Sequence, residues 1–278
     1  MTLFARTHQR ISAYRRRVSE IRRSAKALGW TAPVRFALER RQSDYQSVFD
    51  KPEPLVSICI TTYNKSQLLM ERALASSLAQ TYQNIEILVV GDCCTDDTAE
   101  RMSAVSDPRI WFENLAERGR YPDDPELRWY VAGCVPFNRL LEVAKGDFIT
   151  HLDHDDEYTV DRVEKLVAFS QSTRADFVYH PFLWEQDDGS WSFHEARRFD
   201  LGEVTTSSCF YHRSLASVAG DLHSYRGFEP GDWNRFRRMR FLGARTRRHP
   251  EAMLKHYKEQ SDLRSVSSVD RLAEQAET

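Results

Sequence analysis

The chain has 278 residues with a formal net charge of −2, and 41% of them are hydrophobic, so it can form one large or two small folded domains. No apolar run reaches the length of a membrane span, and the amino terminus lacks the apolar core of a signal peptide. The five cysteines are an odd set without CxxC spacing, which argues against a disulfide framework or a zinc site and favours reduced thiols in a cytosol.

The amino-terminal segment differs in charge from the rest of the chain. Residues 1–41 hold eleven Lys/Arg and two Glu, a net charge of +9, whereas the remainder has a net charge of −11. Gly29 ends one predicted helix and Pro33 opens a second, shorter one. We expect residues 1–50 to form a basic amphipathic helical extension. This prediction rests on apolar residues at spacings of three and four, namely Ile11, Tyr14, Val18, Ile21, Ala25 and Leu28.

Three roles for this extension remain open from the sequence. In the first, its apolar stripe packs on the main domain; in the second, the stripe pairs with another chain. In the third, the stripe lies on an anionic membrane surface with the arginines at the headgroups. The basic charge by itself does not predict a nucleic-acid partner, because no nucleic-acid recognition module accompanies it.

Strand and helix patterns alternate after a proline-containing boundary, KPEP, at residues 51–54. Apolar runs predict the strands, and helical spacing of apolar residues predicts the segments between them. This order predicts a mostly parallel sheet with right-handed crossovers. The predicted strands cover residues 55–60, 85–90, 110–112 and 148–152, and the predicted helices cover residues 66–79, 95–102 and 136–145.

The second half of the chain has a different pattern. A strand is predicted at residues 176–180, and a hairpin turn, DDGS, at 187–190 with its return strand at 191–195. A β-rich run follows at residues 205–212, and an amphipathic helix at 232–242. We therefore divide the chain into the extension 1–50, a main domain 51–260, and a polar tail 261–278 that we expect to be a frayed helix or disordered.

The segment GDFITHLDHDD at residues 146–156 combines an apolar strand with three aspartates at its carboxyl end, Asp153, Asp155 and Asp156. Carboxylates packed this closely repel each other unless a cation lies between them. Mg²⁺ and Mn²⁺ take oxygen ligands of this kind together with substrate phosphates, and open α/β sheets bind ligands beyond the carboxyl ends of their strands. The segment predicts a metal–diphosphate site, and a solvated acidic turn is the alternative.

Four segments together resemble the family-two glycosyltransferases, which are inverting enzymes with the GT-A fold. VSICITTYNK at residues 56–65 is similar to the first strand and its nucleotide-contacting turn, and IEILVVGDCCTDDT at 85–98 to the second strand and base-binding loop. GDFITHLDHDD is similar to the strand that ends in the DxD metal motif, and GDWNRFRRM at 231–239 to the helix start with the catalytic base. The resemblance covers about residues 54–257 and implies a Rossmann-like, three-layer α/β/α fold with a mostly parallel central sheet.

The resemblance implies roles at the nucleotide end of the site. Thr61 and Tyr63 follow the first strand, so their side chains are expected to face the nucleotide sugar, with the Tyr63 ring against the nucleobase. Asp92 is expected to accept a hydrogen bond from a uracil-type imide N–H, which favours a UDP-sugar donor; its alternative role is to cap the following helix. Arg118 is expected to pair with diphosphate oxygens, or else to lie in a solvated basic loop.

The resemblance also implies the metal ligands and the catalytic base. Asp155 is expected to coordinate Mn²⁺ or Mg²⁺, Asp153 to contact the ribose or the metal, and His256 to reach the same metal. Asp232 is the expected general base, which accepts the proton of the acceptor hydroxyl as that oxygen attacks the anomeric carbon.

The sequence departs from the family pattern at three places. Gly231 stands where relatives often have Glu, and Phe137 stands where they often have a basic residue. Cys93 and Cys94 replace the Gly and Ser that are common in the base-binding loop. The expected base and metal ligands are retained.

The sequence thus predicts a metal-dependent inverting glycosyltransferase that uses a nucleotide-diphosphate sugar and an acceptor hydroxyl on a glycan or glycolipid, in surface polysaccharide or glycolipid assembly. We expect it in the cytoplasm, free or peripheral at the inner face of the membrane. A phosphatase of the haloacid-dehalogenase type is disfavoured, because that pattern has Thr or Val where Glu157 stands. The remaining alternative is a non-catalytic glycosyltransferase-like domain that binds a nucleotide or a partner.

Overall fold

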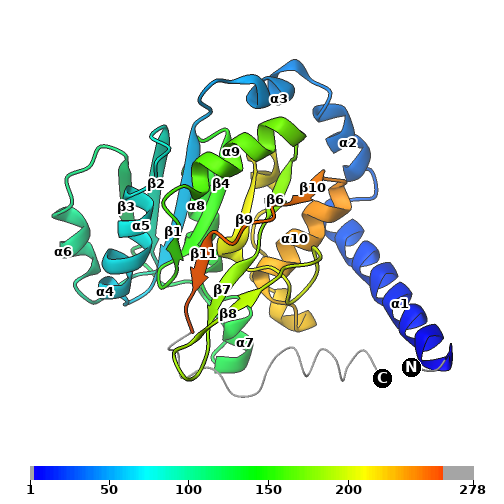
Figure 1. Cartoon of the computed structure of the whole chain (residues 1–278). Helices are drawn as coiled ribbons and strands as arrows, with labels where there is room; N and C mark the ends of the chain where they lie inside the picture. Colours follow the sequence, from blue (N-terminus) through cyan, green and yellow to red (C-terminus); the bar gives the residue numbers. More distant parts are fainter. Residues whose placement is uncertain (1–2, 259–278) are drawn as a thin grey trace.

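The architecture comes from a computed structural model that describes residues 3–258 (Figure 1). The polar tail predicted at residues 261–278 lies outside the described residues.

A seven-stranded sheet forms the centre of the fold, in the order β10-β6-β9-β4-β1-β2-β3. Its middle strands are apolar runs buried on both faces, as in a sheet covered on both sides. Neighbouring strands are parallel except at β9, which runs antiparallel to β4 and β6, so the prediction of a mostly parallel sheet is confirmed. The strands are β1 (Val56–Thr62), β2 (Ile85–Gly91), β3 (Ile110–Asn114), β4 (Phe148–Asp153), β6 (Phe177–Tyr179), β9 (Cys209–His212) and β10 (Thr246–Arg248).

The register of these strands brings polar residues together at one edge of the sheet. Thr61 of β1 lies beside Val90 of β2 on one side and beside Asp153 of β4 on the other. Asp92 directly follows β2, and its backbone N–H donates to the carbonyl of Thr62 at 2.9 Å. Because parallel strands end at the same edge, residues distant in sequence meet there.

Helices flank this sheet (Figure 1). The helix predicted at residues 66–79 forms, with a π-helical turn, Leu69–Leu74, in its middle. α8 packs on β1 and β2, whereas α10 packs on the amino-terminal helix α1. The helices of the main domain are α4 (Ser66–Leu68), α5 (Ala75–Leu78), α6 (Thr98–Ser103), α7 (Pro125–Trp129), α8 (Cys134–Val143), α9 (Arg162–Thr173) and α10 (Gly231–Leu242).

A smaller sheet, in the order β5-β11-β7-β8, returns the chain to the acidic turn after β4. β5 directly follows the aspartates and pairs antiparallel with β11. The predicted hairpin forms between β7 and β8, with Gly189 at a φ of 78° in its turn. This pairing brings His256 beside Asp156 although 100 positions separate them. The strands are β5 (Glu157–Tyr158), β7 (Phe182–Glu185), β8 (Trp191–His194) and β11 (Leu254–His256).

The amino-terminal segment forms three helices, α1 (Leu3–Leu28), α2 (Ala32–Glu39) and α3 (Ser43–Ser47). The apolar stripe predicted on α1 is only partly buried, because Ala25 is buried while Tyr14 is 71% exposed and Ile21 is 40% exposed. The carboxyl-terminal part of the stripe therefore packs on the main domain, where Leu28 contacts the core, and the rest stays in contact with water.

Polar contacts with α10 determine which face of α1 is buried. Glu20 and Ser24 are turned inward. Arg240 Nη2 lies 2.6 Å from Glu20 Oε2, and Arg237 Nη1 lies 2.6 Å from Ser24 Oγ. Guanidinium groups removed from water need such partners, so polar pairing helps to fix the face of α1 that packs on α10.

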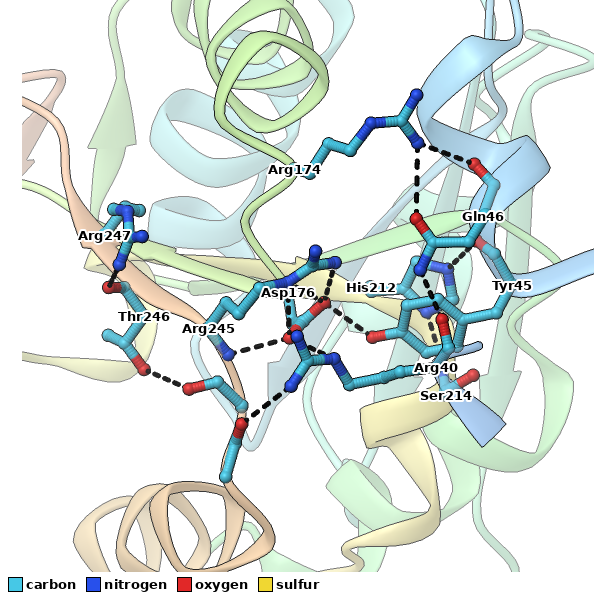
Figure 2. Close-up of polar contacts among 12 residues, drawn as sticks. Arg40, Tyr45, Gln46, Arg174, Asp176, His212, Ser214, Arg245, Thr246 and Arg247 are labelled. Atoms are coloured by element: carbon cyan, nitrogen blue, oxygen red, sulfur yellow. Dashed lines mark hydrogen bonds and ion pairs between the residues drawn. The ribbon is translucent and has the colours of Figure 1, made fainter. Parts of the chain in front are cut away.

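The segment after α2 is joined to the main domain through a buried carboxylate (Figure 2). Asp176, just before β6, has no exposed surface. Its oxygens accept from the hydroxyl of Tyr45 at 2.8 Å and from Arg245 Nη2 at 2.7 Å, and Arg40 Nε lies 3.2 Å away. Phe36 belongs to the same hydrophobic core as the sheet. α2 and α3 are thus integral to the packing of the described chain.

Candidate active site

A cavity of about 1010 Å³ opens at the carboxyl edge of β1, β2 and β4. It is formed by the loops that follow these strands and by the amino end of α10. All the side chains predicted from the sequence line it, namely Thr61, Tyr63, Asp92, Arg118, Asp153, Asp155, Asp232 and His256.

One end of the cavity lies beyond β1 and β2. The guanidinium of Arg118 lies over the ring of Tyr63, with its Cζ 3.8 Å from the ring centre, and its Nε is 4.0 Å from Asp92 Oδ2. The backbone N–H of Gly119 donates to Asp92 Oδ1 at 3.0 Å. This end therefore offers an aromatic ring, a cation and a fixed carboxylate, the groups that a nucleoside diphosphate requires.

The acidic turn follows β4 in the middle of the cavity. The N–H of Asp156 donates to the carbonyl of Asp153 at 3.0 Å, which holds the three aspartates in one tight turn. Removal from water in the cavity wall raises the pKa of Asp153, and the carboxylates of Asp156 and Asp155 raise it further, to about 8. The pKa of Asp155 is also raised, mainly by burial. Negative charge at this turn is therefore incompletely compensated within the protein.

His256 faces this turn from β11. Its Nδ1 lies 2.9 Å from Asp156 Oδ2, and the N–H of Tyr257 donates to Asp156 Oδ1 at 3.1 Å. Burial acts to lower the pKa of His256, but Asp156, Asp153 and Asp155 outweigh it and raise this pKa to about 9. A proton on His256 thus takes part of the place of a cation, and its loss leaves Nε2 as a ligand atom.

These residues fit a divalent ion as a partial shell. Within residues 3–258, no group of three or more His, Cys, Asp or Glu side chains converges closely enough to hold an ion on its own. Two carboxylates with raised pKa values and an imidazole oriented through Nδ1 are the chemistry that Mn²⁺ or Mg²⁺ accepts, with substrate oxygens and water filling other positions. Asp153, Asp155 and His256 are the residues that would hold it.

Asp232 occupies the first turn of α10 and lines the cavity. Its Oδ1 accepts from the N–H of Trp233 at 2.6 Å. Burial raises the pKa of Asp232, while that N–H and the guanidinium of Arg235 act to lower it. A carboxylate with a raised pKa at a helix amino terminus is suited to accept a proton.

Comparison with known sequences identifies the family of this chain. The sequence profile described as glycosyl transferase family 2 matches residues 57–225. The chain belongs to glycosyl transferase family 2.

Two curated relatives match part of the chain. UDP-Glc:alpha-D-GlcNAc-diphosphoundecaprenol beta-1,3-glucosyltransferase WfaP of Escherichia coli is 32% identical over 133 residues, which cover 48% of each chain. Succinoglycan biosynthesis protein ExoO of Rhizobium meliloti (strain 1021) is 31% identical over 122 residues, which cover 44% of this chain and 31% of the relative. The matching part thus spans about half or less of each relative.

Solved structures confirm the GT-A glycosyltransferase fold. Staphylococcus aureus TarS 1–349 in complex with UDP-GlcNAc has a TM-score of 0.58 at 18% identity, covering 74% of this chain and 59% of TarS. The mannosyltransferase PcManGT of Pyrobaculum calidifontis in complex with GDP-Man and Mn²⁺ has a TM-score of 0.56 at 16% identity, covering 87% of this chain and 70% of PcManGT.

Two departures from the family-2 pattern have local explanations. A Cβ at Gly231 would lie 3.0 Å from the backbone oxygen of Tyr130, so a Glu there would require the α7 loop to shift. Phe137 places an aromatic ring where relatives often have a basic residue, and Arg235 of α10 lies over that ring at 4.0 Å. Sequence reasoning missed Arg235; the available signal was its position one helical turn after Asp232.

Proposed function

We propose that the chain is a metal-dependent inverting glycosyltransferase that moves a sugar from a nucleotide-diphosphate donor to an acceptor hydroxyl. One observation carries the proposal: in this family-2 domain, the residues expected to bind the metal and the nucleotide and to act as base line a single cavity. They are Asp153, Asp155, His256, Tyr63, Asp92 and Asp232. UDP is the favoured nucleotide, because Asp92 offers an acceptor for the imide N–H of uracil.

The donor is held in two places. Tyr63 stacks on the nucleobase, and Arg118, already over the Tyr63 ring, turns toward the phosphates. Asp153, Asp155 and His256 hold the divalent ion. When bound, that ion neutralises the charge that develops on the departing diphosphate.

Asp232 takes the proton from the acceptor hydroxyl as its oxygen attacks the anomeric carbon. The bond to the diphosphate breaks in the same displacement, and attack from the opposite face inverts the anomeric centre.

The proposed acceptor is a hydroxyl of a glycan or glycolipid in surface polysaccharide or glycolipid assembly. ExoO is named for succinoglycan biosynthesis, and the name of WfaP gives a diphosphoundecaprenol-linked sugar as acceptor. We place the chain in the cytoplasm, peripheral at the inner face of the membrane. No helix within residues 3–258 is both long and apolar enough to cross a bilayer.

The proposed membrane contact is the basic extension 1–50. Trp30, Val34 and Leu38 repeat at a spacing of four, and each is more than half exposed beside the arginines of α1 and α2. An exposed apolar stripe within residues 1–41, whose net charge is +9, suits an anionic lipid surface, and that charge opposes self-association through like-charge repulsion.

Nucleotide binding is tested first. Thermal-shift measurements with UDP, GDP, dTDP and CMP, each with and without Mn²⁺, should show stabilisation by UDP that depends on Mn²⁺. If none of the nucleotides stabilises the protein with Mn²⁺ present, the proposed donor site is wrong.

Catalysis is tested with Asp232→Asn. Release of UDP from a panel of UDP-sugars with glycolipid extract should fall about 10²–10⁴-fold, the usual contribution of a general base, while UDP binding stays unchanged. The matched control is Asp161→Asn, which removes the half-exposed carboxylate beside α9, outside the cavity. A wild-type protein that binds UDP but turns over no donor would support the non-catalytic alternative.

Membrane contact is tested by flotation with vesicles. Wild type should float with vesicles containing phosphatidylglycerol but not with pure phosphatidylcholine, and Trp30→Ser with Leu38→Ser should abolish flotation. Val160→Ser is the control, because Val160 is equally exposed on another part of the domain. A protein that stays in solution with both vesicles and elutes as a dimer would assign the stripe to self-association.

A further inference from the structure

Arg235 is a buried cation that forms no direct ion pair with a carboxylate of the described residues, although its charge acts on Asp232. It lies on α10, lines the cavity and is only 2% exposed. Its Nε donates to the carbonyl of Val218 at 2.9 Å, and its Nη2 donates to the hydroxyl of Tyr211 at 3.0 Å. In the part of the chain that the structure describes, no carboxylate lies within 4.0 Å of its guanidinium. Burial of an uncompensated charge is unfavourable unless another partner offsets it.

The guanidinium keeps unused hydrogen-bond donors on one edge. Two of its five N–H groups are used by Val218 and Tyr211, and Nη1 makes no hydrogen bond to the described residues. Its position over the ring of Phe137 restrains the plane of the group. A restrained edge of Nη1 and Nη2 matches the two oxygens of a carboxylate.

His151 is a second polar group with unused capacity beside Arg235. Its Nε2 lies 2.6 Å from the hydroxyl of Tyr211, the same hydroxyl that Arg235 contacts, and its ring stacks on Phe137 at 4.3 Å. His151 lines the cavity and is 3% exposed, but its Nδ1 has no hydrogen-bond partner among the described residues. A buried nitrogen of this kind needs an explanation, and a polar ligand provides one.

The order of strands locates these groups along the cavity. Tyr63 and Asp92 follow β1 and β2, the acidic turn follows β4, and Arg235 is bonded to Tyr211 of β9, the next strand in the same direction. Arg235 therefore lies at the α10 side of the cavity, one helical turn from Asp232, between Tyr211 of β9 and Phe137 of α8. In the proposed function, on which this inference rests, the transferred sugar and the acceptor meet there.

Arg238 shows that burial alone does not explain Arg235. It lies on the same helix and is also buried, and its guanidinium donates to the carbonyls of Asn234 and Ala219. Arg238 does not line the cavity. Of these two arginines, Arg235 is the one that presents unused donors to the cavity.

We propose that Arg235 binds the carboxylate of a hexuronic acid at the sugar end of the cavity. The carboxylate places a negative charge directly against the guanidinium and accepts two charge-assisted hydrogen bonds, which neutral sugar hydroxyls cannot match. The same chemistry fits a hexuronic acid in the donor or in the acceptor, and the experiment separates these sources.

The experiment measures binding by calorimetry with Mn²⁺ present. UDP is measured first, followed by two matched pairs, UDP-glucose with UDP-glucuronate and UDP-galactose with UDP-galacturonate. At least one hexuronate should bind about 10–100-fold more tightly than its neutral partner, as expected for charge-assisted hydrogen bonds. If neither pair differs, UDP-saturated protein should instead prefer methyl glucuronide or methyl galacturonide over the corresponding hexoside, which assigns the carboxylate to the acceptor.

Substitutions identify the residue responsible. Arg235→Met should abolish the preference for the hexuronate and leave UDP affinity unchanged, whereas Arg238→Met should keep the preference. Arg235→Lys retains the positive charge but loses the planar guanidinium with its paired N–H donors, so it should keep only part of the preference for the hexuronate. This variant tests the assignment if Arg235→Met fails to fold.

The proposal is overturned if neither donor nor acceptor hexuronates are preferred, or if the preference survives Arg235→Met. Loss of UDP affinity in Arg235→Met would also overturn it, because the guanidinium would then serve the diphosphate. A wild type that does not bind UDP contradicts the proposed function itself, which is a separate result.

Discussion

Carboxylates lie next to the central sheet at two places, at Asp176 before β6 and at the acidic turn of Asp153, Asp155 and Asp156 after β4, but their surroundings differ. Asp176 is enclosed by the hydroxyl of Tyr45 and the guanidinium groups of Arg40 and Arg245 (Figure 2). At the turn, Asp153 accepts from the hydroxyl of Ser207 at 3.2 Å, and no Lys or Arg among the described residues forms an ion pair with it. Asp176 has two guanidinium groups beside it, whereas the carboxylates of the turn have His256 as their only ion-pair partner among the described residues.

This contrast is the one expected between a structural carboxylate and a carboxylate that we propose to bind a cation. A carboxylate with its cations in place stabilises the fold and has little capacity left for chemistry. Carboxylates crowded together with raised pKa values, such as Asp153 and Asp155, are unfavourable in the empty protein and become favourable when a cation binds. Removing a carboxylate charge should therefore lower the stability of the protein at Asp176 but not at the acidic turn.

The largest expected effect is on stability at Asp176. Asp176→Asn leaves Arg40 and Arg245 without their shared counter-charge, so the free energy of unfolding should fall by about 3–5 kcal/mol. Urea denaturation monitored by tryptophan fluorescence measures the change. Asp155→Asn, measured by urea denaturation without metal, should have an unchanged or a higher free energy of unfolding. An equal loss of stability in Asp176→Asn and Asp155→Asn would show that the two carboxylates contribute to folding in the same way.

The next effect is on metal-dependent stabilisation at Asp155. With Mn²⁺ and UDP at 100 times their dissociation constant, wild type should gain about 2.7 kcal/mol of stability, and Asp155→Asn should lose this gain. Thermal shifts with Mn²⁺ and after addition of a chelator measure it. An Asp155→Asn protein that keeps the full shift would remove Asp155 from the metal site.

A smaller effect is expected at Asp156, which orients His256 without lining the cavity. Asp156→Ala should weaken Mn²⁺ binding about 10–100-fold, because the imidazole loses the partner that fixes its ring and its tautomer. Titration of Mn²⁺ followed by electron paramagnetic resonance measures affinity without turnover. His154→Ala is the control, since His154 lines the cavity beside the same aspartates. Equal loss in both variants would contradict an orienting role.

Local sequence was enough to predict the acidic turn. An apolar run followed by aspartates defines the end of a strand and the ligands beyond it, and strand order then brings Thr61, Asp92 and Asp153 to one edge. These predictions depend only on features a few residues long. The parallel sheet and the hairpin at residues 187–190 were predictable for the same reason.

The orientation of particular faces was not predictable. The contact between Asp156 and His256 depends on the pairing of β5 with β11. The register of this pairing cannot be predicted from the sequence of either strand alone. Arg235 lay within a correctly predicted helix, but which of its arginines faces the cavity depends on how α10 packs against α1 and β9. For α1, apolar spacing left the partner of the stripe open; Ala25 is buried and Leu28 packs on the core, and polar pairs with α10 add to this contact.

The smallest expected effect is a pH dependence at the acidic turn. The raised pKa values of Asp153 and His256 mean that the folded protein holds more protons than the unfolded chain, so metal-free stability is present at low pH and is lost as pH rises toward 8–9. Mn²⁺ replaces those protons, and its affinity should increase about tenfold per pH unit for each proton displaced. Thermal shifts with and without Mn²⁺ at pH 6 and 7.5 measure this, and the Mn²⁺-dependent shift should be larger at pH 7.5. Asp153→Asn should reduce the difference between the two pH values, whereas a larger shift at pH 6 would mean that protons and metal do not compete for this turn.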